Sequence, residues 1–167
     1  ELAYIDVSIG NKETSLDLYK RAKQLCIEED NQYLLAKVYL DLERYHTTLA
    51  DYASGINSLD TALNIINSNN ISSLKPLVYN SYGYLYLSIH DFSIAKYYTK
   101  LAISSIVGET NKTNYISSLL LLGKIFFSNN EKDSAFYYYN EALIYAKRAN
   151  SKLLKQSAYR KLSEYYI

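Results

Sequence analysis

The sequence of 167 residues has few of the residues that interrupt helices or build disulfide and metal sites. It contains one proline, five glycines, no methionine and no tryptophan. Its single cysteine, Cys26, excludes an internal disulfide framework and a zinc cluster of several thiolates. With 49% apolar residues, the chain can bury a core and form long helices. Because methionine is absent, we interpret Glu1 as an internal residue of a longer protein.

Charge and hydropathy argue against a nucleic-acid-binding protein and against a membrane-inserted segment. The 18 Lys and Arg residues nearly balance the 17 Asp and Glu residues, so the net charge of +1 makes nucleic acid an unfavoured partner. The most apolar run, residues 116–127, contains Lys124 and is shorter than the ~20 residues that span a bilayer, so we expect no membrane insertion here. No secretory signal pattern is visible. The compartment and the oligomeric state stay open, with a slight preference for the cytoplasm.

Small residues recur at intervals of forty residues, without insertion or deletion. One column contains alanine in all four cycles, at Ala22, Ala62, Ala102 and Ala142. Three further columns keep the same register. The first contains Ser15, Gly55, Ala95 and Ala135, and the second contains Tyr19, Leu59, Thr99 and Tyr139. The third, which we refer to as the glycine column, contains Ala3, Glu43, Gly83 and Gly123. Four columns that share one register predict an array of structural repeats.

Each cycle has the apolar spacing of two helices. The first helix of the third cycle has its stripe at i, i+3, i+4 and i+7, on Tyr79, Tyr82, Gly83 and Tyr86. Small residues that face each other allow two antiparallel helices to approach closely, so each cycle predicts a helical hairpin. Polar clusters separate the helices. The expected helices cover residues 13–29, 32–47, 52–67, 73–89, 92–107, 113–128, 132–148 and 152–166, with a partial helix at 1–8.

The repeats resemble the tetratricopeptide repeat (TPR) family. The third cycle matches the family pattern at Tyr79, Tyr82, Gly83, Tyr86, Ala95, Thr99 and Ala102. The fourth cycle matches it at Leu119, Leu122, Gly123, Phe126, Ala135, Tyr139 and Ala142. The second cycle departs, with Glu43 in the glycine column and Gly55 opposite. The period of forty also exceeds the usual ~34 residues and is similar to long-repeat variants in sensor and regulator proteins.

This resemblance implies an all-α fold, an α-α superhelix in which antiparallel hairpins stack as a right-handed solenoid. We expect a single array over residues 1–167, with a partial repeat at 1–30, repeats at 31–70, 71–110 and 111–150, and a terminal helix at 151–167. That terminal helix repeats the first-helix stripe with Tyr159, Leu162, Ser163 and Tyr166. A polar cap that closes the array is the alternative interpretation of this helix.

No motif of a known catalytic, phosphate-binding or dinucleotide-binding centre occurs in the sequence. His46 and His90 are its two histidines, and neither has acidic or thiol companions at metal-ligand spacing. His46 shares a column with Tyr86 and Phe126, which predicts a half-buried packing residue, whereas His90 is expected in a turn. Cys26 is expected as a small buried residue. We therefore expect no enzymatic activity, no catalytic residue, no cofactor and no metal.

By resemblance to the TPR family, the first helix of each hairpin lines a concave face that binds a protein or peptide. The partner-binding residues that this implies are Lys37, Leu40, Arg44, Asn80, Tyr84, Leu87, Leu120, Lys124, Phe127 and Arg160. Apolar anchors mixed with isolated charges are typical of peptide grooves. The Lys/Asn/Arg arrangement with which some family members bind a C-terminal carboxylate is not matched here.

Charge and tyrosine content bear on the kind of partner. Residues 1–47 carry nine acidic and six basic residues, whereas residues 109–167 carry five acidic and nine basic residues. The basic end would suit an acidic or phosphate-rich partner, but it lacks the interleaved aromatic residues of a nucleic-acid surface. The twenty tyrosines fit either a binding surface or a bias toward AT-rich codons.

These observations predict a non-enzymatic TPR scaffold module that binds a protein or peptide along its concave face. The alternative hypothesis is a sensory or regulatory segment of a bacterial signalling protein or transcriptional regulator, in which the array controls another domain. An enzyme is a third hypothesis, and no motif supports it. The sequence does not identify the partner.

Overall fold

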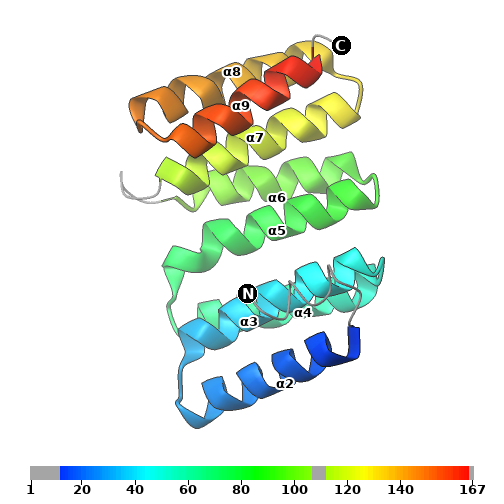
Figure 1. Ribbon diagram of the computed structural model, residues 1–167, viewed down its shortest axis with the longest axis vertical. Helices are drawn as coiled ribbons and strands as arrows, with labels where there is room; N and C mark the ends of the chain where they lie inside the picture. Colours follow the sequence, from blue (N-terminus) through cyan, green and yellow to red (C-terminus); the bar gives the residue numbers. More distant parts are fainter. Residues whose placement is uncertain (1–11, 107–111, 166–167) are drawn as a thin grey trace. The chain divides into compact units, whose positions relative to one another are not determined.

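The computed structural model describes residues 12–106 and 112–165, and the regular elements within these ranges are all helical (Figure 1). The helices are α2 (Lys12–Glu28), α3 (Gln32–Thr48), α4 (Tyr52–Ser68), the 3-10 helix η1 (Ser72–Leu74), α5 (Lys75–Ser88), α6 (Phe92–Ser104), α7 (Lys112–Ser128), α8 (Lys132–Arg148) and α9 (Lys152–Tyr165). They match the predicted ranges within a few residues and confirm the all-α fold class. The helix expected at 1–8, Ala3 of the glycine column and Tyr166 of the terminal stripe lie outside the described residues.

Within the described residues, a turn residue with positive φ follows a helix every twenty residues from 30 to 90 and again at 130 and 150. Backbone φ lies between 47° and 62° at Asp30, Ala50, Asn70, His90, Asn130 and Asn150. The next N–H then donates to the carbonyl five residues earlier, as from Asn31 to Cys26 and from Asp51 to His46. The side chains of Asn31, Asp51 and Asp91 also accept an N–H from the first turn of the following helix. Where both turns of a forty-residue repeat are described, the repeat therefore contains two turn-and-helix units of twenty.

The turn at Ala50 predicts a stabilising substitution. Its φ is 58°, where the Cβ of an L residue costs roughly 1–2 kcal/mol. The Ala50→Gly variant should therefore raise the free energy of unfolding by about 1 kcal/mol, measured by urea titration followed by circular dichroism. The control is Lys100→Gly, at an exposed position inside α6, which should lower it by roughly 0.5–1 kcal/mol. Equal losses in both variants would contradict the turn geometry.

The chain divides into two compact units, residues 1–81 and 82–167, and the boundary falls within α5. In the first unit, α2 packs on α3 and α3 packs on α4, with Tyr19, Leu42 and Tyr45 in a core cluster. In the second unit, α6 packs on α7, α7 on α8, and α8 on α9. Apolar side chains of these helices form the core clusters of that unit. The organisation of residues 1–167 as one array stays a prediction.

Helices of the second unit approach each other at the predicted small-residue columns. A Cβ added to Gly83 would overlap the side chain of Thr99, and one added to Gly123 would overlap the ring of Tyr139. Two of the forty-residue columns contain alanine in this unit, and all four of these side chains are fully buried: Ala95, Ala102, Ala135 and Ala142. A small residue on one helix thus leaves room for a larger one on its partner, and this complementarity allows close packing.

The glycine column contains Glu43 in the first unit, and this side chain is 3% exposed. The Thr47 hydroxyl donates a hydrogen bond of 2.9 Å to its carboxylate. Burial raises the pKa of Glu43 from its ordinary value of 4.5 to about 6, although hydrogen bonds from Thr47 and Ser81 and the charge of Arg44 oppose this rise. The departure of the second cycle from the family pattern therefore places an ionisable group in the interior.

Candidate functional site

Residues from α5, α7 and α9 surround a pocket of about 200 Å³ in the second unit. The lining residues are Tyr84 from α5, Ser117, Leu120 and Lys124 from α7, and Leu154, Ser157, Arg160 and Lys161 from α9. Three pairs among them stand forty residues apart: Tyr84 and Lys124, Ser117 and Ser157, Leu120 and Arg160. Equivalent positions on successive first helices therefore build this pocket.

The pocket combines cationic, hydroxyl and apolar groups. The Lys124 Nζ atom lies 5.7 Å from the centroid of the Tyr84 ring. Burial lowers the pKa of Lys124, and the charge of Lys161 lowers it further. The Lys161 Nζ atom contacts Glu164 Oε2 at 2.6 Å, and burial raises the pKa of the Tyr84 phenol. This set of groups can hold an anionic group beside an apolar one.

Four residues expected to bind a partner line this pocket: Tyr84, Leu120, Lys124 and Arg160. Phe127 is half-buried and packs against the core cluster of α8 and α9. Leu87 is buried in a different cluster, with Ala95, Leu121 and Ile125. A covered side chain offers a partner little surface, so we do not include Leu87 in the binding surface.

The four remaining predicted residues lie in the first unit and differ in exposure. Lys37 is exposed, and its Nζ atom lies 5.9 Å from the ring centroid of Tyr33. Arg44 is exposed as well and forms an ion pair of 2.7 Å with Asp41. Leu40 and Asn80 are buried. Like Leu87, these two side chains serve packing in this structure and are left out of the binding surface.

Leu154, Ser157 and Lys161 also line the pocket, although they are not among the residues that the sequence predicts to bind a partner. A signal for Ser157 was present, because it stands forty residues after Ser117, another residue of the pocket. Leu154 and Lys161 have no such counterpart in the pocket. Their place depends on how α9 packs against α7 and α8, which spacing along the chain does not give.

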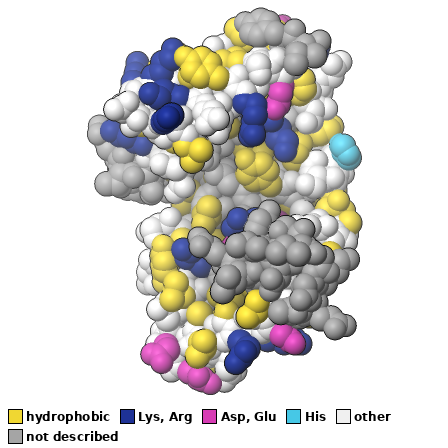
Figure 2. Space-filling view, viewed as in Figure 1, with side chains coloured by type: hydrophobic (Ala, Val, Ile, Leu, Met, Phe, Trp, Pro, Cys, Tyr) yellow, Lys and Arg dark blue, Asp and Glu magenta, His cyan; other side chains and the backbone are white. Residues whose placement is uncertain are grey.

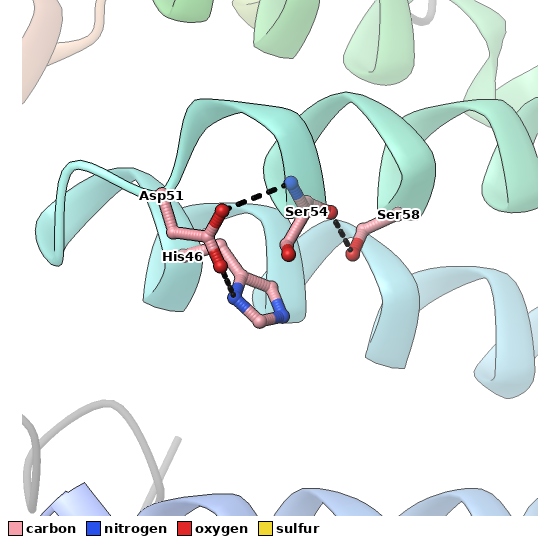
Figure 3. Close-up of polar contacts among 4 residues, drawn as sticks. All are labelled: His46, Asp51, Ser54 and Ser58. Carbon is pink, nitrogen blue, oxygen red and sulfur yellow. Dashed lines mark hydrogen bonds and ion pairs between the residues drawn. The ribbon is translucent and has the colours of Figure 1, made fainter.

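The two histidines lie where the sequence predicts and serve the turns between helices. His46 is half-buried, and its Nδ1 atom lies 3.4 Å from Asp51 Oδ2 (Figure 3). Asp51 also accepts the Ser54 N–H at 3.2 Å as the N-cap of α4. Hydrogen bonds from Ser54 and the interaction with His46 lower the pKa of Asp51. His90 is the turn residue between α5 and α6, and its ring contacts Phe92 edge-on.

Cys26 is buried, as predicted. No group of three or more His, Cys, Asp or Glu side chains in the described part of the chain is arranged to hold a metal ion. Among the helices that the structure describes, none has both the length and the apolar character needed to cross a membrane.

Comparison with solved structures identifies proteins of similar fold. One is a Signal Transduction ATPase with Numerous Domains (STAND) from Pyrococcus horikoshii that has a tetratricopeptide repeat sensor: TM-score 0.80, 20% identity, 99% of this chain and 25% of that chain covered. Another is BtubC from P. vanneervenii, with a TM-score of 0.72 and 17% identity over 90% of this chain and 62% of that chain. No family model matches the sequence. No curated protein matches it.

These likenesses show the fold alone. The chain is a TPR-like helical repeat module, as its sequence predicts, and it spans about a quarter of the length of the STAND protein.

Proposed function

We propose that this chain is a non-enzymatic module of the TPR family that binds a peptide segment of a protein partner in the pocket between α5, α7 and α9. The observation that carries the proposal is the convergence of Tyr84, Leu120, Lys124 and Arg160 on one pocket. The same residues are expected to bind a partner on the separate ground of resemblance to the family.

The chemistry of the pocket favours a peptide with an acidic side chain next to an apolar one. Lys124, Arg160 and Lys161 bring three cationic side chains to the pocket. The charges of Lys124 and Lys161 oppose each other, so an anionic group between them would relieve this repulsion. Leu120 and Leu154 supply the apolar contact.

Selection of peptides from a random library, followed by fluorescence anisotropy, tests this proposal. Tyr84→Ala and Lys124→Gln should each weaken binding of the selected peptides by about tenfold, while circular dichroism stays helical. The matched controls are Tyr97→Ala and Lys100→Gln, which change exposed residues of α6 outside this pocket and should leave affinity unchanged. Peptides that bind both sets of variants as well as the original chain would refute the assignment of the pocket.

A second candidate function is a sensory segment of a bacterial signalling protein. It is favoured by the likeness to a STAND protein with a TPR sensor, of which this chain covers 25%. On this proposal, peptide binding alters the output of a domain elsewhere in a longer protein. The test adds a selected peptide to that longer protein and measures nucleotide hydrolysis or DNA binding. An output that neither the peptide nor Lys124→Gln changes would contradict a sensory role.

A further inference from the structure

The pocket between α5, α7 and α9 carries more positive charge than one carboxylate neutralises. Lys124, Arg160 and Lys161 line it, and none of the described residues that line it is acidic. Glu164 is not a lining residue, but it contacts the Lys161 Nζ atom at 2.6 Å and offsets one of these three charges. Three positive charges less one leave two. Figure 2 shows Lys and Arg side chains beside hydrophobic ones on this face of the second unit.

Two serine hydroxyls of the pocket are available to a ligand. Ser117 and Ser157 line it from equivalent positions of α7 and α9, forty residues apart. The hydroxyl of the neighbouring Ser118 donates instead to the carbonyl of Asn114, as serines inside helices often do. In the described part of the chain, the hydroxyls of Ser117 and Ser157 form no hydrogen bond. Both can therefore donate to a group bound in the pocket.

The Tyr84 phenol and the Lys124 ammonium group add to this set of donors. Burial raises the pKa of Tyr84, so its hydroxyl keeps its proton at neutral pH and can donate. Burial and the charge of Lys161 lower the pKa of Lys124, and the charge of Glu164 opposes this effect. An anion beside Lys124 and Lys161 would stabilise both charges.

A phosphoryl group matches this set of donors better than a carboxylate does. At neutral pH it carries a charge of about −1.5 to −2 on three terminal oxygens, whereas a carboxylate carries one charge on two oxygens. Lysine, arginine and hydroxyl donors are those that bind phosphoryl oxygens in proteins. The two positive charges that remain after Glu164 is counted would thus be neutralised by one phosphoryl group.

The size and the apolar wall of the pocket indicate the source of that group. A volume of about 200 Å³ is below the range of about 300–1,000 Å³ that is typical of sites for whole small molecules. One side chain of a peptide therefore suits it better than a free nucleotide. Leu120 and Leu154 also line the pocket, and an inorganic phosphate ion would make no use of them.

We propose that this pocket recognises a phosphoserine side chain of a peptide in which the neighbouring residue is apolar. The inference rests on the proposed function and names the anionic group that the peptide supplies. The three cationic side chains and the two serine hydroxyls bind the phosphoryl oxygens, and the two leucines contact the apolar neighbour.

The test lets the immobilised full chain select from one peptide mixture. In this mixture the residue before a fixed leucine is phosphoserine, glutamate or serine in equal amounts, and the other positions are degenerate. Phosphoserine peptides should be enriched. The best-bound sequence is then made with each of the three residues, and fluorescence anisotropy should show that the phosphoserine version binds at least about tenfold more tightly than the glutamate version.

Removal of the two hydroxyls separates recognition of a phosphoryl group from attraction to any anion. Ser117→Ala combined with Ser157→Ala should reduce the preference for phosphoserine over glutamate by at least about threefold while circular dichroism stays helical. The matched control is Ser93→Ala combined with Ser128→Ala, at exposed residues of α6 and α7 outside the pocket, which should leave the preference unchanged. An unchanged preference in the first variant would show that its serines do not bind the phosphoryl group.

The outcomes distinguish failure of this inference from failure of the proposed function. Equal affinity for the phosphoserine and glutamate versions, with binding that Lys124→Gln still weakens, would overturn the inference and support the peptide pocket. Binding that neither Lys124→Gln nor Tyr84→Ala changes would refute the pocket itself. Displacement of the peptide by inorganic phosphate at concentrations near the Kd of the peptide would show that the pocket binds free phosphate, which would also overturn the inference.

Discussion

The Gly123→Ala variant should unfold with a free energy about 2 kcal/mol lower than that of the original chain. Its new Cβ would overlap the ring of Tyr139, which is 1% exposed and is enclosed by apolar residues of α8 and α9. Overpacking of a rigid interior costs about 1–3 kcal/mol, and the better helix propensity of alanine offsets up to about 1 kcal/mol of this loss. Urea titration followed by circular dichroism measures the difference.

A double-mutant cycle shows whether the loss at Gly123 is steric. The position equivalent to Tyr139 in α4 is Leu59, in the repeat where Glu43 replaces glycine. Tyr139→Leu should therefore cost at least about 1 kcal/mol less in the Gly123→Ala background than in the original chain. Ser128→Ala, at an exposed position of the same helix, should change stability by less than about 0.5 kcal/mol. Additive losses in the cycle would show that the ring of Tyr139 is not the obstacle.

The Glu43→Gln variant should be about 2 kcal/mol more stable than the original chain near neutral pH and about equally stable below pH 4.5. Glu43 is 3% exposed, and its pKa is raised from 4.5 to about 6. Between these two values the folded chain binds more protons than the unfolded chain, so this group makes stability fall as pH rises. The loss is complete above about pH 6 and amounts to 1.36 kcal/mol for each unit of the shift. Glutamine keeps an oxygen that can accept the Thr47 hydrogen bond without the buried charge.

Urea titrations of both chains between about pH 4 and pH 8 measure this difference, and the comparison cancels the groups that the two chains share. Glu29→Gln, at an exposed carboxylate, is the control and should give a difference of less than about 0.5 kcal/mol over the whole range. A Glu43→Gln variant that is less stable than the original chain near neutral pH would mean that the buried carboxylate is favoured as an anion.

The helices could be predicted from the sequence because close helix packing restricts the size of the residues at the contact. Wherever two helices approach as tightly as at Gly123 and Tyr139, one of them must carry a small residue. Because the same helix contact recurs in each repeat, a small residue is required every forty residues. The twenty-residue spacing of the positive-φ turns is less visible in the sequence, because Asp, Ala, Asn and His all occupy that position. The backbone determines this turn geometry, because the N–H after the positive-φ residue donates to the carbonyl five residues earlier whatever the side chain.

The candidate site was predictable only in part. Leu40, Asn80, Leu120 and Arg160 form one column of the repeat and are equivalent in sequence register. Leu40 and Asn80 are buried, Leu120 is half-buried and Arg160 is exposed. The exposure of a side chain depends on what covers it, and neighbours differ between equivalent positions even when the helix geometry repeats. Arg44, Tyr84, Lys124 and Glu164 form another column, and all four keep an exposed surface, although the pocket partly desolvates Tyr84 and Lys124.

The sequence by itself determined the all-helical fold, the forty-residue repeat and the places where helices begin and end, whereas the four predicted residues that line the pocket came from the resemblance to the TPR family. The fold, the repeat and the helix ends follow from residue size, turn chemistry and helical periodicity, which are local properties that recur in each cycle. Only the tertiary structure decided which members of a column reach the surface. It also decided that Leu154 and Lys161 complete the pocket, because their place depends on how α9 packs against α7.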